Sequence, residues 1–261
     1  MKVAAIQLSA GTDTSQAVEK ALGFVRQAAA EGARLVALPE YFTYYGPEET
    51  WAGVAKQGED ILSVFGAASR ELGVFILAGS VLLPSGEPDK SQNVSVMFGP
   101  DGKGLARYAK THLFDADTEA GSYRESRWLT PGDGPKTTVV DDWTLGFSLC
   151  FELRFPGHFT TLRHMGAHII AVPSAFTGET GEEHWLTLVK CRAMDSQCYM
   201  LAPALAGRVG PKRCFGHTVI VDPWGRVLNL LETGEGVALA DVSLETVVNI
   251  RKAMPLYLDP V

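Results

Sequence analysis

Segments with strand-like and helix-like hydrophobic patterns alternate along this chain, and that alternation limits its fold more than any other feature. The apolar run at 2–8 is followed by apolar residues at helical spacing over 17–29 and by a second apolar run at 34–38. A helix predicted at 60–72 and a buried strand predicted at 74–80 repeat the same unit. Repeated strand and helix units favour an α/β fold in which helices cover a sheet.

The middle of the chain is instead rich in short strand patterns and turns. These strands are predicted at 92–98, 104–110, 137–140 and 143–149. Helix and strand patterns then resume, with helices at 157–165, 181–195 and 243–253 and strands at 168–172, 199–203, 215–221, 226–230 and 235–241. The strand count fits two mixed sheets packed face to face. No Ser-, Gly- or Pro-rich linker divides the chain, so we expect a single domain over 1–261.

Charge and cysteine content narrow the class of protein. The 23 basic and 30 acidic residues give a formal net charge of -7, and no long basic run occurs, which argues against nucleic acid or an anionic membrane as a partner. No apolar run approaches the roughly 18 residues of a membrane-spanning helix. The N-terminal segment lacks the pattern of a cleaved leader. The 4 cysteines form no CxxC pair, so we expect free thiols in a cytoplasmic protein.

Three potentially reactive side chains lie where predicted buried strands end. Glu40 follows RLVALP, Lys110 ends GLARYAK, and Cys150 ends WTLGFSLC. Ligand crevices in open α/β folds form at this end of the strands, because a rigid sheet holds the loops there. We therefore expect the three side chains to converge.

The chemistry of these groups is complementary. A cysteine nucleophile needs a base or a nearby cation, since an ordinary thiol is mostly protonated at neutral pH. Glu40 can serve as the base, and the Lys110 ammonium can face the oxyanion that forms when Cys150 attacks a carbonyl or nitrile carbon. On spacing alone a structural reading stays open, in which Glu40 caps a turn, Lys110 lies on the surface and Cys150 packs in the core.

Longer segments around these residues resemble a known family. LPEYF at 38–42, YAKTHLFD at 108–115 and CFELRFP at 150–156 resemble, in order, the three signature segments of the nitrilase superfamily, the carbon–nitrogen hydrolases. The resemblance continues through 184–200 and 215–227 and so covers nearly the whole chain.

The resemblance implies a fold and a set of catalytic roles. The family has an α-β-β-α sandwich, in which Glu40 would be the general base, Lys110 the oxyanion stabiliser and Cys150 the nucleophile. The backbone amide of Phe151 would be the second oxyanion donor. Glu125 matches a second family glutamate that orients the substrate amide and the lysine. The resemblance implies no metal and no organic cofactor, and it implies a homodimer.

The segments FDAD, YRES and HW are most similar to the small-amidase branch, which includes omega-amidases and amidases of deaminated glutathione. Their substrates carry carboxylates. Arg154 is a candidate to bind one, because a guanidinium pairs with a carboxylate through two hydrogen bonds, although it can equally bridge Glu152. Tyr45, Phe176 and Thr177 are expected, by analogy, to line the pocket.

Other functions remain open at this stage. A nitrilase or N-carbamoyl amide hydrolase has the same catalytic groups, and a catalytically silent binding protein can keep the fold. Cys150 is followed by Phe151 and Glu152 where the family usually has Tyr and Asp, which leaves the nucleophile untouched. His164 and His168 are four residues apart, but Gly166 between them indicates a helix end, and no zinc spacing is completed.

Overall fold

The computed structural model describes residues 1–118, 121–210 and 212–256, and its centre consists of two six-stranded mixed sheets. The first sheet contains β1 (Lys2–Gln7), β2 (Leu35–Ala37), β3 (Phe75–Pro84), β4 (Ser91–Phe98), β5 (Gly104–Ala109) and β16 (Gly236–Asp241), in the order β16-β1-β2-β3-β4-β5. The second contains β8 (Thr137–Val140), β9 (Trp143–Phe147), β10 (Ile169–Ala171), β11 (Tyr199–Ala202), β14 (Thr218–Val221) and β15 (Val227–Leu231), in the order β15-β14-β11-β10-β9-β8. Each sheet has three parallel central strands and antiparallel strands at its edges.

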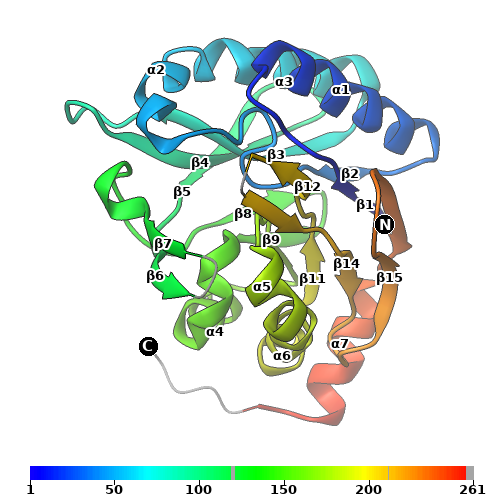
Figure 1. The fold of residues 1–261 in the computed structure, drawn as a ribbon. Coiled ribbons are helices and arrows are strands. Elements are labelled where there is room, and N and C mark those ends of the chain that lie inside the picture. Colours follow the sequence, from blue (N-terminus) through cyan, green and yellow to red (C-terminus); the bar gives the residue numbers. More distant parts are fainter. Residues whose placement is uncertain (119–120, 211, 257–261) are drawn as a thin grey trace.

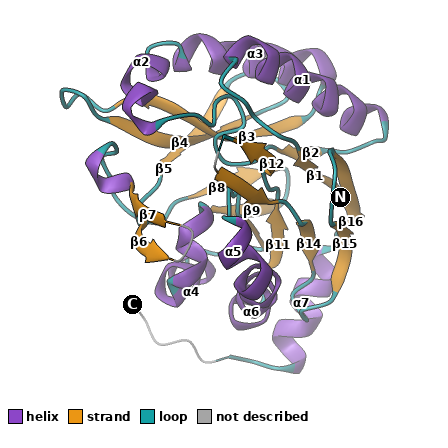
Figure 2. Ribbon diagram, viewed as in Figure 1, coloured by secondary structure: helices purple, strands orange, loops and turns teal. Residues whose placement is uncertain are grey.

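Helices cover the outer face of each sheet (Figures 1 and 2). The first sheet packs against α1 (Thr14–Ala30) and α3 (Gly58–Leu72), and the second against α4 (Pro156–His164) and α6 (Leu186–Ser196). Shorter or peripheral helices are α2 (Trp51–Ala55), α5 (Gly178–Thr180) and α7 (Leu244–Ala253). The α-β-β-α sandwich implied by the family resemblance is therefore confirmed.

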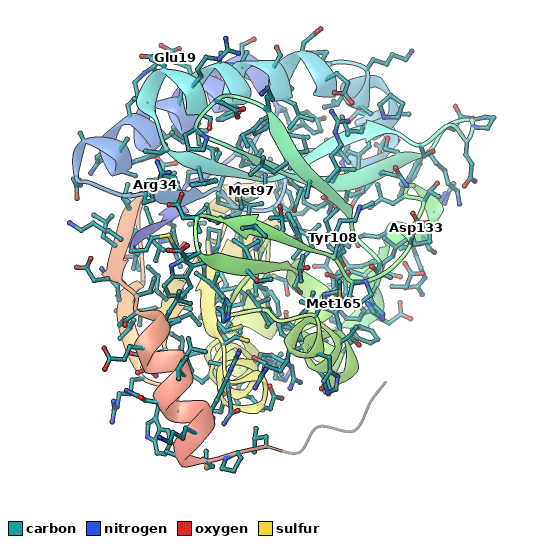
Figure 3. All side chains as sticks on the ribbon, turned by 180° about the vertical axis from the view of Figure 1, so that it is seen from behind. Glu19, Arg34, Met97, Tyr108, Asp133 and Met165 are labelled. Carbon is teal, nitrogen blue, oxygen red and sulfur yellow. The ribbon has the colours of Figure 1, made fainter. Side chains whose placement is uncertain are left out.

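The two sheets share one apolar interior because their strands alternate between two buried faces. In β1, Val3 and Ala5 face the second sheet, whereas Ala4 and Ile6 face the helices. Residues in register across each sheet extend the shared interior, namely Val3, Leu35 and Phe75 in the first sheet and Leu145, Ile169 and Tyr199 in the second. Figure 3 shows Met97 and Tyr108 in this layer between the sheets.

Three regions differ from the sequence prediction. The strand predicted at 215–221 is interrupted, because Gly216 and His217 both have positive φ, 75° and 59°, which an extended strand does not allow. Only its first residue, Phe215, belongs to a strand before the break, β13 (Lys212–Phe215), which pairs with β12 (Ala206–Val209) in a hairpin. A second hairpin that was not predicted joins β6 (Asp115–Thr118) to β7 (Gly121–Arg124). The predicted strand at 143–149 ends earlier, at Phe147.

Within the described residues, no helix combines the length and the apolar character that crossing a membrane requires.

Candidate active site

Glu40, Lys110 and Cys150 line one cavity. Glu40 lies three residues after β2, and Lys110 directly follows β5, so both come from the first sheet. Cys150 begins a 3-10 turn, Cys150–Arg154, that follows β9 of the second sheet. The expected convergence at the strand ends is therefore observed, and it joins residues from both sheets.

Glu40 is fully buried, and its carboxylate is held on both oxygens. Oε1 accepts hydrogen bonds from Asn93 Nδ2 and Lys110 Nζ, both at 2.9 Å, and Oε2 accepts one from the backbone amide of Ala175 at 3.0 Å. The neighbouring Cys150 thiol also favours the ionised form of this carboxyl group and lowers its pKa slightly. Burial raises the pKa of Glu40 more than the neighbouring Lys110 ammonium lowers it. Glu40 is therefore a stronger base than a surface glutamate, and it lines the same cavity as the Cys150 thiol.

Lys110 lies between two carboxylates. Its Nζ is 2.9 Å from Glu40 Oε1 and 2.8 Å from Glu125 Oε2, and its side chain is only 1% exposed. Burial alone lowers the pKa of Lys110, but the charges on Glu125 and Glu40 outweigh it and raise the pKa above its ordinary value. The cavity therefore contains a buried ammonium in a fixed position.

Glu125 opens a short turn, Glu125–Arg127, after the β6–β7 hairpin. Its Oε1 accepts a hydrogen bond from the Tyr41 hydroxyl at 3.0 Å, and its Oε2 accepts one from the Phe114 amide at 2.7 Å. These bonds orient the carboxylate toward Lys110 and into the cavity.

Cys150 has an unusual backbone conformation for a residue other than glycine, with φ of 45°. Its amide donates to Pro173 O at 3.0 Å. Burial raises the pKa of the Cys150 thiol well above its ordinary value, the Glu40 charge raises it further, and Lys110 opposes both. Cys150 therefore rests as a thiol at neutral pH, and its proton must move during any attack on a substrate.

The remaining residues singled out from the sequence line the same cavity. These are Tyr45, Phe151, Arg154, Phe176 and Thr177. The Arg154 guanidinium lies over two aromatic rings, with Cζ 5.9 Å from the centre of Phe151 and 5.6 Å from that of Phe176. Its Nη2 lies 3.2 Å from His184 Nδ1.

Arg154 differs from the other cations on the cavity wall. Arg124 forms two hydrogen bonds with Asp117, each of 2.9 Å, and Lys212 pairs with Glu48 at 2.5 Å. Within the described part of the chain, Arg154 has no carboxylate partner. The positive charge of Arg154 is therefore available to a ligand.

Sequence reasoning missed two residues that hold the catalytic candidates. Asn93 is buried in the centre of β4 and donates to Glu40. The burial expected for this strand was a usable signal, because a buried amide needs a partner. Tyr41 donates to Glu125, and its position directly after Glu40 suggested nothing about that contact.

Two mixed sheets covered by helices, with a buried carboxylate, ammonium and thiol in one cavity, define a protein of the nitrilase superfamily. Among solved structures, Saccharomyces cerevisiae Nit3, a member of branch 10 of that superfamily, superimposes with a TM-score of 0.89 at 28% identity over 98% of this chain and 95% of its own. The C. elegans NitFhit protein has a TM-score of 0.91 at 27% identity, over 97% of this chain and 63% of its own.

Sequence comparison identifies the family directly. The Carbon-nitrogen hydrolase family matches residues 2–252. Deaminated glutathione amidase of Synechocystis is 34% identical over 97% of this chain and 95% of its own, and the human omega-amidase NIT2 is 32% identical over 98% and 93%. The chain belongs to the carbon–nitrogen hydrolase family and is an enzyme that hydrolyses carbon–nitrogen bonds other than peptide bonds.

Proposed function

We propose that this protein is a thiol amidase that cleaves a small, linear, carboxylated amide to an acid and ammonia. One observation carries the proposal: Glu40, Lys110, Cys150 and Glu125 share a single cavity with Arg154, whose positive charge has no carboxylate partner within the described residues. The first four groups suit attack on an amide carbon, and the fifth suits a substrate carboxylate.

In the proposed reaction, Cys150 loses its proton to Glu40 as its sulfur attacks the amide carbon. The Lys110 ammonium and the Phe151 amide stabilise the oxyanion of the tetrahedral intermediate. Glu40 then donates the proton to the departing nitrogen, so that ammonia leaves and a thioester remains. Glu40 next takes a proton from water, which attacks the thioester carbon. The carbon–sulfur bond then breaks, Glu40 returns the proton to the sulfur, and the acid and the Cys150 thiol are released. Glu125 orients Lys110 and the substrate amide.

The proposed substrate is the omega-amide of a 2-oxo acid or a deaminated glutathione. Relatives that are 32% and 34% identical carry the names omega-amidase and deaminated glutathione amidase. In this chain, Arg154 would bind the substrate carboxylate, while Tyr45, Phe151, Phe176 and Thr177 would enclose the chain between carboxylate and amide.

Ammonia release from a panel of compounds tests this assignment. The panel is 2-oxoglutaramate, deaminated glutathione, a simple nitrile and an N-carbamoyl amino acid. We expect turnover of at least one of the first two and little of the others. Preference for the nitrile or the carbamoyl compound would assign the chain to the alternative activity of the superfamily. If none of the four compounds is turned over, the amidase proposal is contradicted and a catalytically silent binding protein is favoured.

Replacing Arg154 with methionine is expected to raise KM for a carboxylated amide by about 10- to 100-fold, because a hydrogen-bonded charge pair is lost on binding. The kcat should change little, since Arg154 is not among the groups that meet the amide carbon. Steady-state kinetics with 2-oxoglutaramate and with an uncharged amide of similar length measure the effect, which should be confined to the first.

Arg124→Met is the matched control for that experiment. Arg124 lines the same cavity, but Asp117 already neutralises its charge through two hydrogen bonds. An equal rise in KM for both variants would mean that general cavity charge, rather than Arg154, binds the carboxylate.

We also propose that residues 1–261 form one carbon–nitrogen hydrolase domain that assembles as a homodimer in the cytoplasm. The shared interior between the two sheets supports the single domain. The need to keep the Cys150 thiol reduced supports a reducing compartment. Light scattering of the purified protein tests the dimer, and cell fractionation tests the location.

A further inference from the structure

Lys110 and Cys150 follow strands of different sheets, so no single strand sets the distance between them. Lys110 comes directly after β5 at the edge of the first sheet. Cys150 comes after β9, near the edge of the second. Because a displacement of about 1 Å can cost roughly 100-fold in rate, the two segments need a specific connection.

Glu152 lies where the two segments meet. It is fully buried, and its Oε1 accepts hydrogen bonds from the Tyr108 hydroxyl at 2.5 Å and from the amides of Thr111 at 2.8 Å and His112 at 3.3 Å. Its Oε2 accepts a hydrogen bond from the Leu149 amide at 2.7 Å. One oxygen thus holds the residues on both sides of Lys110, and the other holds the residue before Cys150.

The carboxylate is the form that this environment favours. Burial raises the pKa of Glu152, but the neighbouring His112 and His158 rings, the Tyr108 hydroxyl and the Thr111 amide outweigh burial and hold the pKa below its ordinary value. An ionised group with several donors forms stronger hydrogen bonds than a neutral one.

The hydrogen bond to Leu149 also stabilises the turn that presents the thiol. The positive φ of Cys150 is rarely adopted by a non-glycine residue, so surrounding contacts must maintain it. The Leu149 amide is held by Glu152 Oε2, the Cys150 amide by Pro173 O, and the Glu152 amide by Leu149 O.

We propose that Glu152 is a positioning residue that ties the segment of Lys110 to the turn of Cys150 and so fixes the ammonium and the thiol relative to each other. This role rests on the proposed function of those two residues. It assigns Glu152 no contact with the substrate, because its side chain is fully buried and it does not line the cavity.

The cluster of His112, Glu152 and His158 fits a positioning role better than it fits a site for a metal cation. Single ligand atoms of His112, Glu152 and His158 lie within 4.8 Å of one another. Both Glu152 oxygens, however, already accept hydrogen bonds, and His158 Nε2 is bonded to Phe147 O at 2.9 Å. A bound cation would have to compete with the backbone donors that hold the two catalytic segments.

Glu152→Gln tests the proposal with little change in volume. Glutamine keeps one acceptor, but its amide nitrogen must face a backbone donor, so one of the two segments is released. We expect alkylation of Cys150 by iodoacetamide, followed by mass spectrometry, to slow by about tenfold or more. Alkylation of Cys191, an exposed thiol on α6, should be unchanged in the same sample.

Steady-state kinetics give a second readout. On an amide that the wild type turns over, kcat should fall by a factor similar to the alkylation rate, while KM stays within about twofold, because substrate contacts remain. Asp222→Asn is the matched control. Asp222 is also a buried carboxylate that accepts two backbone amides, from Trp224 and Arg226, but it lies in the β14–β15 turn.

Both variants are compared at a temperature at which circular dichroism shows them folded. The proposal would be overturned if Cys150 is alkylated in Glu152→Gln at the wild-type rate. It would also be overturned if Asp222→Asn loses as much alkylation rate and kcat as Glu152→Gln. Failure of the amidase proposal would appear separately, as absence of amide turnover by the wild type. The alkylation rates would still report whether Glu152 positions the thiol.

Discussion

Cys150→Ala should reduce ammonia release from the preferred amide by roughly 10⁴- to 10⁶-fold, the loss typical of removing a covalent nucleophile. Without sulfur, no thioester can form, and hydrolysis would require direct attack by water on an unactivated amide. KM or Kd for the substrate should change little, because Arg154 and the cavity wall remain in place. Ammonia release and substrate binding, measured side by side, separate these two effects.

Cys198→Ala is the matched control for that loss. Cys198 is a buried thiol whose sulfur donates to Ala167 O at 3.1 Å, in the core between the second sheet and its helices. This variant is expected to lose some stability and keep its turnover number. In wild type, rapid quenching followed by mass spectrometry should find the acyl group on Cys150. Substantial turnover by Cys150→Ala would show that Cys150 is not the nucleophile.

The positions of the catalytic candidates follow from patterns that the sequence carries locally. The helix predicted at 60–72 is observed as Gly58–Leu72, and Gly73 ends it in a left-handed conformation, with φ of 66°. Apolar runs also located the strands that precede Glu40, Lys110 and Cys150. Strand ends at one edge of the first sheet bring Glu40 and Lys110 together. Cys150 follows a strand of the second sheet, so the packing of the two sheets is also needed to bring it to them.

The rest of the site depends on contacts that no local pattern encodes. Glu125 follows a polar hairpin without strand alternation, and its orientation is set by Tyr41, which lies 84 residues earlier in the chain. The β12–β13 hairpin brings Lys212 to the cavity, although the sequence predicted no strand over 206–214. Such contacts are set by tertiary packing, so spacing alone could not predict them.

The two interpretations of Arg154 also show that spacing along the sequence does not fix where a side chain points. Its spacing from Glu152 allowed either a bridge between them or a cavity-facing guanidinium. The residues lie in one 3-10 turn, where side chains two positions apart point in different directions. Glu152 points inward to Tyr108, and Arg154 lies on the cavity wall. The turn geometry, which the sequence did not predict, thus separates the two side chains.

Glu40→Gln should lower kcat/KM by about 10²- to 10⁴-fold, the range for loss of a general base. Its clearest signature is in the pH profile. Glu40 acts as a base only when ionised, and burial raises its pKa, so wild-type activity should fall with decreasing pH at a higher pH than for an ordinary glutamate. In Glu40→Gln, the residual activity should lack this acid limb. kcat/KM measured across the acid and neutral range tests both statements.

Glu125→Gln distinguishes the base from its neighbour. The Glu125 charge raises the pKa of Glu40, and Glu125 also shares the Lys110 ammonium with it. Removing that charge favours ionised Glu40, so the acid limb should remain but move to lower pH. An acid limb that persists unchanged in Glu40→Gln would assign the base to another group. If the acid limb instead disappears in Glu125→Gln, Glu125 is the general base, because the limb is lost only when the residue whose titration causes it is replaced.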